Sequence, residues 1–185
     1  MVSFYFLGVA MIAACCVLNV SIKNAFPAEK SFLFLGIFFM SYFFSLRMID
    51  AGSDTIFYYS AFSFFKGVDL SELSISALSY GYISQEKLFS LLTFFLSRFL
   101  DFDGYLFTVS FISILASSIY YEKVIGRNYY FVFLIFICGT TAIYLFGNTI
   151  RQGLSLPLAF LASWYYFYGH KKLGVCIFIA CIFVH

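Results

Sequence analysis

Long apolar runs separated by short polar connectors make up most of the 185-residue chain. A helix needs about 20 residues to cross roughly 30 Å of hydrocarbon, and somewhat shorter helices are tolerated where the bilayer thins. Five runs approach this length, at residues 2–22, 31–46, 105–121, 129–146 and 154–168. The pattern therefore predicts an all-α fold, a polytopic membrane bundle of about five to six transmembrane helices.

The two ends of the chain add to this expectation. A sixth apolar run begins at Leu173 and is still apolar at His185, where the sequence ends. The unfinished run predicts that residues 1–185 form a single transmembrane domain from the N-terminal part of a longer protein. Residues 1–14 contain no Lys or Arg, so the positively charged region of a signal peptide is missing. We therefore expect a retained first transmembrane helix.

The run at residues 86–100 differs from the others because as a helix it would reach only about 22 Å. Polar residues recur every three or four positions along it: Glu86, Ser90, Thr93 and Ser97. This spacing places them in one stripe of a helix. Such a stripe is typical of a helix that lies in the membrane interface or re-enters it. We therefore predict that this helix does not span.

Charge placement supports the same topology. If residues 86–100 do not cross, the basic residues of the short connectors share one side, as the positive-inside rule requires. They are Lys23, Lys30, Lys123, Arg127, Lys171 and Lys172. The other side receives Asp50, Asp54, Asp69, Glu72, Glu86, Asp101 and Asp103. The N-terminus and residues 47–104 then lie on the outer face, with interfacial helices near residues 55–65 and 86–100.

Composition agrees with a membrane protein. Hydrophobic residues make up 63% of the chain and charged residues 11%, whereas a soluble domain carries roughly 25% charged residues. The formal net charge is only +2 and is spread over the connectors, which argues against nucleic acid as a partner. The sequence contains no Walker loop, dinucleotide-binding glycine pattern, HExxH or GxSxG motif, so no soluble-enzyme class is indicated.

Two carboxylates stand at the starts of the outer helices. Asp54 begins the first, with Tyr58 one turn later, and Ser53 or Asp54 can cap that helix. Glu86 opens the second, where the positive end of the helix dipole favours a carboxylate. For both residues a capping role and a catalytic role stay open at this point.

Arg151 is the more specific signal. It lies near the outer end of two apolar runs, with Asn148 and Ser155 on its helical face. An Arg there can snorkel to the headgroups, but deeper in the membrane it would cost about 2.5–3.5 kcal/mol, which favours a functional role. Arg is also the preferred bidentate partner of phosphate. A lone His such as His185 is usually structural, yet this topology brings His185 toward the outer face as well. We therefore expect these ionisable groups to converge on one site.

The polar residues follow an order that resembles the EpsG family, from about residue 45 to the end. The matching positions are Arg47, Gly52-Ser53-Asp54, Tyr58, Glu86, Leu88-Phe89, Ile150-Arg151-Gln152 and Phe183-Val184-His185. Members of this family are Wzy-like polymerases of bacterial exopolysaccharide, capsule and O-antigen. The chain has Lys87 where the family often has proline, and Gly153-Leu154-Ser155 where it often has alanine.

The resemblance implies a membrane glycosyltransferase, with a layout like that of GT-C enzymes. It would join undecaprenyl-pyrophosphate-linked oligosaccharide repeat units at the outer, periplasmic face of the bacterial inner membrane. The implied catalytic residues are Asp54, Glu86 and His185. The implied substrate-binding residues are Arg151, Arg47, Tyr58 and Gln152. In this scheme Asp54, or failing that Glu86, acts as general base, and Arg151 holds the pyrophosphate.

The same resemblance sets the expected cofactors and partners. The glycosyl-pyrophosphate bond supplies the energy, so no nucleotide cofactor is expected; no metal ligands are predicted, and a need for divalent metal stays open. Partners are lipid-linked oligosaccharides, the lipid bilayer and other polysaccharide assembly proteins. Two alternatives stay open: a transporter or flippase of lipid-linked oligosaccharides, and a non-catalytic subunit of an assembly complex.

Overall fold

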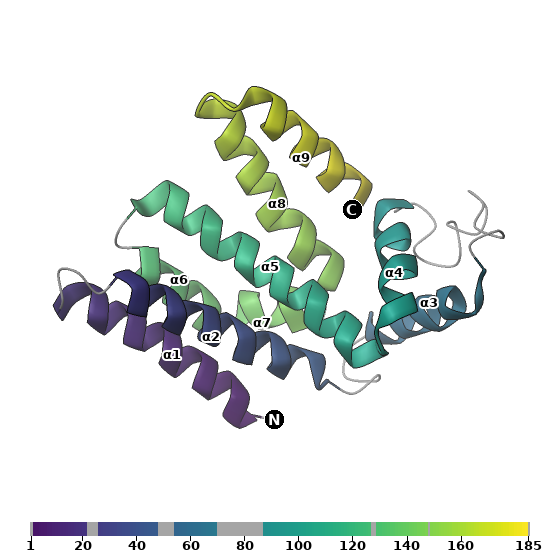
Figure 1. The fold of residues 1–185 in the computed structure, drawn as a ribbon, viewed down its shortest axis with the longest axis horizontal. Coiled ribbons are helices and arrows are strands. Elements are labelled where there is room, and N and C mark those ends of the chain that lie inside the picture. Colours follow the sequence, from purple (N-terminus) through teal and green to yellow (C-terminus); the bar gives the residue numbers. More distant parts are fainter. Residues whose placement is uncertain are drawn as a thin grey trace.

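The structure is a computed structural model that describes residues 2–21, 26–47, 54–69, 87–126, 129–147 and 149–184. Within these residues the secondary structure is helical and includes no strand (Figure 1). The helices are α1 (Val2–Ser21), α2 (Phe26–Ser45), α3 (Thr55–Gly67), α4 (Lys87–Phe99), α5 (Phe102–Ile125), α6 (Tyr129–Cys138), α7 (Thr140–Gly147), α8 (Ile150–Phe167) and α9 (Lys171–Val184). The predicted all-α class is confirmed.

Helix α5 lies between two apolar cores. The first core packs α1, α2, α6 and α7 against the middle of α5, where Ile114 is fully buried. The second packs α3, α4 and α8 against the N-terminal part of α5, at Tyr105, Leu106 and Val109. Figure 1 shows α5 running between these two groups of helices. The N-terminal part of α5 is therefore where α3, α4 and α8 meet.

Only some of the predicted membrane spans correspond to a single long apolar helix. Among the described residues, only α5 is by itself long and apolar enough to cross a membrane, and Ser3–Leu18 of α1 form a shorter apolar helix. Helices α6 and α7, with 10 and 8 residues, are too short alone and pass this test only together, and a bend of 71° separates them. The run at residues 129–146, predicted as one span, is therefore a bent pair of helices that can form a broken span or a re-entrant loop. The number of membrane crossings stays a prediction.

The bend between α6 and α7 has a local cause at Gly139. The backbone N–H of Gly139 donates to the carbonyl of Phe136, three residues back, at 3.0 Å, so the regular four-residue spacing is broken there. Glycine has no Cβ and costs more than alanine inside a helix, which makes it a common point of interruption. Helix α7 therefore points in a direction of its own and ends beside the start of α8.

The two short outer helices form as predicted, but the polar stripe of α4 faces inward. Ser90, Thr93 and Ser97 are buried, while Phe99 on the opposite side is 83% exposed. The stripe that predicted an interfacial or re-entrant helix therefore faces the neighbouring helices. The hydroxyl of Thr93 donates to the carbonyl of Phe89 at 2.9 Å, which lowers the cost of burying it. The interfacial location of α3 and α4 stays a prediction.

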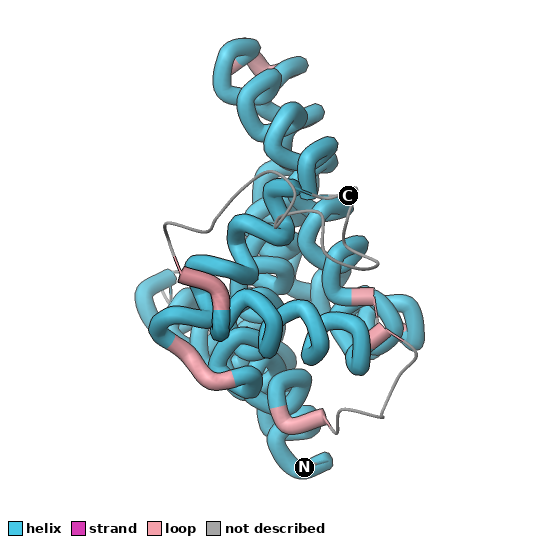
Figure 2. The backbone as a smooth tube through the Cα atoms, turned by 90° about the vertical axis from the view of Figure 1, so that its right-hand side faces the viewer, coloured by secondary structure: helices cyan, strands magenta, loops and turns pink. Residues whose placement is uncertain are grey.

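The bundle has two ends with different polar residues. At one end, which we call the basic end, Lys30 of α2 contacts Glu122 of α5, and Lys123 lies 5.5 Å from the ring centroid of Trp164 on α8. At the other end, which we call the arginine end, Arg47 follows α2 and Arg151 lies in the first turn of α8. Figure 2 shows the turn between α8 and α9 projecting beyond the other helices, far from the N-terminus.

Candidate functional site

Arg47 is held by the end of α7. Its Nη1 donates to the backbone carbonyl of Phe146 at 3.3 Å and to that of Gly147. The last carbonyls of a helix have no partner within the helix, and a cation there also suits the negative end of the dipole. The Nε and Nη2 atoms of Arg47 are buried and have no hydrogen-bond partner among the described residues. Arg47 is therefore held through Nη1, while its Nε and Nη2 atoms could still donate hydrogen bonds to a ligand.

Arg151 reaches across to α3. Its Nε donates to the hydroxyl of Tyr58 at 3.1 Å, and its guanidinium carbon lies 5.7 Å from the centroid of the same ring. Tyr58 is 1% exposed and packs edge-on against Phe89 of α4. Two of the predicted site residues, far apart in the sequence, are therefore in direct contact.

Tyr105 of α5 completes the buried cluster, and no pattern in the sequence predicted its role. Its side chain is fully buried, and its hydroxyl lies 3.2 Å from Oγ1 of Thr93 on α4. Tyr105 stands in an apolar run, where a tyrosine is usually a membrane-interface anchor. Thr93 did carry a signal, because it belongs to the polar stripe of α4. The structure shows that this stripe points toward the cluster.

The charge states in the cluster follow from burial. Burial lowers the pKa of Arg47 to about 10, and the nearby phenols of Tyr105 and Tyr58 oppose this shift. Arg47 is still a cation at neutral pH. Burial also raises the pKa of the Tyr58 phenol, against the lowering effect of Arg151. Two cations therefore lie next to neutral phenols, an arrangement that attracts an anionic group.

Asp54 lies at the start of α3 but does not cap it with its side chain. Its backbone carbonyl accepts hydrogen bonds from the N–H groups of Phe57 and Tyr58, at 3.0 and 3.1 Å. The carboxylate makes no capping bond, because the residue has helical angles of φ −91° and ψ −24° instead of the extended ones of a cap. The predicted cap is therefore wrong at Asp54, and Ser53 lies outside the described residues. The charge of Asp54 contributes to the raised pKa of Tyr58, so the carboxylate lies near the cluster.

The other predicted site residues are not brought together by the described residues. Gln152 is exposed on α8, next to Arg151 but outside the buried cluster. Glu86 and His185 lie outside the described residues. Helix α9 does run toward this end, because the thiol of Cys181 donates to the carbonyl of Ser155 on α8 at 3.0 Å. No group of three His, Cys, Asp or Glu side chains in the described part of the chain is placed to hold a metal ion.

Gly153 sets the contact between α7 and α8. A Cβ atom at Gly153 would lie 2.5 Å from the carbonyl oxygen of Leu145 on α7, and real Cβ contacts are essentially never that short. Only glycine therefore lets the first turn of α8 lie directly against α7. Because Arg151 precedes this residue by two positions and the end of α7 holds Arg47, the same contact sets how the two arginines are placed.

The fold and this cluster define a helical protein with a buried guanidinium site. In the comparison with protein families, the model of the EpsG family matches residues 30–185. The match covers most of the chain, so the chain belongs to the EpsG family, the family of Wzy-like polysaccharide polymerases, and the resemblance seen in the sequence is confirmed. No curated protein and no solved structure matches the chain. Family membership indicates that the chain is a membrane protein with a role of the polysaccharide-polymerase type.

Proposed function

We propose that the protein joins undecaprenyl-pyrophosphate-linked oligosaccharide repeat units into a surface polysaccharide. Membership of the EpsG family supports a polymerase role. The observation that carries the finer proposal is the pair of cations at the arginine end, Arg47 and Arg151, which lie beside the same phenol, Tyr58. A planar guanidinium matches the oxygen geometry of a phosphate group, and a phosphate would supply acceptors for Nε and Nη2 of Arg47, which have no partner among the described residues.

The proposed reaction transfers the growing chain from its undecaprenyl pyrophosphate to an incoming lipid-linked unit. The bond between the anomeric carbon and the pyrophosphate oxygen breaks, and the pyrophosphate leaves with the electron pair. An acceptor hydroxyl at the non-reducing end of the incoming unit forms the new glycosidic bond and gives its proton to a carboxylate base. Negative charge develops on the leaving pyrophosphate, where Arg47 and Arg151 stabilise it.

The other residues take supporting roles in this proposal. Tyr58 accepts the Nε–H of Arg151 and so holds that guanidinium at the arginine end. Asp54, one turn before Tyr58, is the proposed base, with Glu86 as the second choice. His185 is proposed as a second base or phosphate ligand, and Gln152 as a sugar contact at the exposed edge.

We further propose a multi-pass arrangement in the bacterial inner membrane, with the arginine end facing the periplasm. Two features of the described residues support this orientation. The basic end carries Lys30 and Lys123, as the positive-inside rule expects of the cytoplasmic side. Helices α3 and α4 turn apolar side chains outward, including Ile56 and Phe95, as helices at a membrane interface do.

The position of the cluster favours a polymerase over a transporter. A transporter of lipid-linked sugars would place its charged residues near the middle of its helices, around an internal path. Here Arg47 follows the end of α2, and Arg151 lies in the first turn of α8. Both arginines are therefore at helix ends, where a substrate lying in the outer leaflet would present its pyrophosphate.

The experiment that tests this function is the profile of lipid-linked sugars in cells that carry Arg151→Ala in the full-length protein. The expected result is single repeat units on the carrier lipid with no long polymer, at normal protein level. A matched control is Arg98→Ala, since Arg98 is exposed on α4 and lies over the Phe94 ring, 4.7 Å from its centroid. This control should keep the normal ladder of chain lengths.

Each alternative gives a different profile. A flippase defect would leave no lipid-linked units facing outward, whereas a polymerase defect would accumulate them there. A normal ladder with Arg151→Ala would mean that Arg151 is a membrane anchor or that the chain is a non-catalytic subunit. Either of these results would contradict the proposed function.

A further inference from the structure

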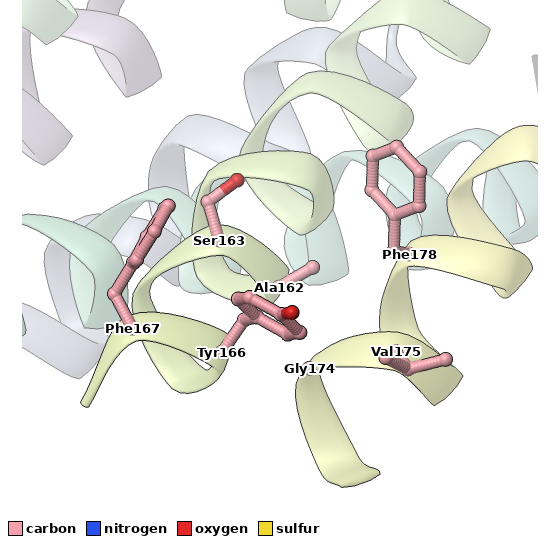
Figure 3. A pocket seen from close by; sticks show the side chains of 7 residues that line it. All are labelled: Ala162, Ser163, Tyr166, Phe167, Gly174, Val175 and Phe178. Carbon is pink, nitrogen blue, oxygen red and sulfur yellow. The ribbon is translucent and has the colours of Figure 1, made fainter. Parts of the chain in front are cut away.

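A pocket of about 230 Å³ lies between α8 and α9, close to the turn that joins them (Figure 3). Its walls are mainly apolar and aromatic, with Tyr166 and Phe167 from α8 and Val175 and Phe178 from α9. Phe167 is 80% exposed and Phe178 is 50% exposed, so the pocket opens to the surroundings of the protein. It is separate from the arginine end, because Ser163 lies twelve positions after Arg151, about 18 Å along a helix.

A close helix contact forms the floor of the pocket. A Cβ atom at Gly174 would lie 2.7 Å from the carbonyl oxygen of Ala162 and 2.7 Å from the backbone nitrogen of Tyr166. The two helix backbones therefore touch at this glycine. The large side chains on either side of the contact stand around it and leave a groove, which Figure 3 shows between Phe167 and Phe178.

Positive charge stands at the start of α9, one turn before the α9 residues that line this groove. Lys171 precedes Val175 by four residues and Phe178 by seven, so these three residues lie on one face of α9. Both Lys171 and Lys172 are exposed and belong to the first turn of α9. The first turn of a helix also carries the positive end of the dipole, so nothing in the helix itself offsets these lysines. The apolar groove is therefore lined on its α9 side by residues that follow an anion-attracting helix start by one turn.

We propose that this groove is a binding site for one anionic phospholipid. An acyl chain would lie against Val175 and Phe178, and the phosphate would meet Lys171, Lys172 and the backbone N–H groups of the first turn of α9. A neutral lipid would gain nothing from the positive charge of the two lysines, and a soluble anion would bury no apolar surface in the groove. Trp164 and Tyr168 stack close by, with ring centroids 4.8 Å apart, and Trp and Tyr are enriched at the level of lipid headgroups.

The site is tested with the purified full-length chain, stripped of lipid and offered phosphatidylglycerol and phosphatidylcholine with identical acyl chains in equal amounts. Native mass spectrometry counts the lipids retained. We expect phosphatidylglycerol to be preferred, and Lys171→Gln with Lys172→Gln to reduce this preference by about fivefold for each lysine. The control Lys87→Gln removes an exposed lysine from the start of α4 and should leave the preference unchanged.

A second variant tests the groove itself. Val175→Trp fills it from an exposed position (44% exposed), so the fold should tolerate the change while the retained phosphatidylglycerol is lost. The matched control is Val132→Trp, at a comparably exposed position of α6 (39% exposed). Unchanged retention in the lysine variant or in Val175→Trp would overturn the proposal. A dimer that Val175→Trp converts to a monomer would also overturn it, because a second copy would then occupy the groove.

Discussion

The two ends of the helix bundle treat cationic side chains in opposite ways. At the basic end, the Nζ of Lys30 lies 2.7 Å from a carboxylate oxygen of Glu122 and 3.5 Å from the hydroxyl of Tyr129. At the arginine end, Arg47 is held only through Nη1, by backbone carbonyls, and its other nitrogens have no partner among the described residues. Lys30 is therefore paired within the protein, whereas Arg47 has donor nitrogens without a partner among the described residues.

The difference shows why counting charges along the sequence locates a site poorly. A buried donor without a partner is costly, typically about 1–3 kcal/mol and more for a charged group. A cation kept in that state therefore points to a ligand that compensates for it. By this criterion Arg47 is a stronger indicator of function than Lys30, although the family resemblance assigned the pyrophosphate to Arg151 and not to Arg47.

The largest effect is expected from Arg47→Leu. It removes the guanidinium and also the cation at the end of α7, and losing one such stabilising group typically costs about 10²- to 10³-fold in rate. Polymer per unit of protein, measured in cells at matched expression, should fall by that order. Lys30→Met, which removes a cation from the basic end, should leave the polymer unchanged. If both variants behave alike, the two ends do not differ in function.

Gly153→Ala should come next. The added methyl group meets the carbonyl of Leu145 on α7, and overpacking of this kind typically costs about 1–3 kcal/mol. We expect a lower melting temperature and shorter polymer, because α8 must move away from α7 and carry Arg151 with it. Gly67→Ala is the control, since nothing lies within 4 Å of a Cβ atom there. Equal melting temperatures and polymer lengths in the two variants would contradict the proposed contact.

Tyr58→Phe should have a smaller effect. The ring and its packing stay, but Arg151 loses the acceptor of its Nε–H, and a hydrogen bond to a charged group is typically worth about 1.5–3 kcal/mol. We expect weaker use of lipid-linked substrate at normal protein level, seen as a raised KM with a smaller change in kcat. Tyr59→Phe makes the same change on the next residue, which is exposed, and should be silent. Identical kinetics for the two would rule out a positioning role for Tyr58.

The smallest effect is expected at the basic end itself. Glu122→Gln breaks an ion pair whose side chains are 33% and 37% exposed, so solvent already screens it. Such pairs are typically worth about 0–1 kcal/mol. The melting temperature should fall slightly and less so at high salt, with no change in polymer length. A strong loss of polymer from this variant would place functional residues at the basic end instead of the arginine end.

The sequence predicted much of the local structure because local signals determine it. Apolar runs gave the long helices, and the spacing of polar residues gave α4. The order of Asp54, Tyr58 and Arg151 indicated a common site, and the structure places Tyr58 and Arg151 in contact. These features depend on residues that are close in the chain or on a shared side of the membrane.

The rest depends on contacts between distant segments. The 71° bend at Gly139 turns α7 so that its last carbonyls meet Arg47, about a hundred residues earlier in the chain. No hydrophobic pattern around Arg47 or around α7 predicts this contact. Likewise, the polar stripe of α4 suits an outward or an inward face equally well, and the position of Tyr105 beside Thr93 decides between them.

The most direct test of the arginine end is the binding of undecaprenyl pyrophosphate to the purified full-length chain in nanodiscs, with undecaprenyl monophosphate for comparison. The wild-type protein should prefer the diphosphate, because Arg47 and Arg151 place two positive charges at this end, and the diphosphate carries more negative charge than the monophosphate. Arg47→Gln and Arg151→Gln should each abolish this preference, while Lys30→Gln should preserve it. Equal binding of the two lipids by the wild-type protein, or an unchanged preference in both arginine variants, would contradict a pyrophosphate site at this end.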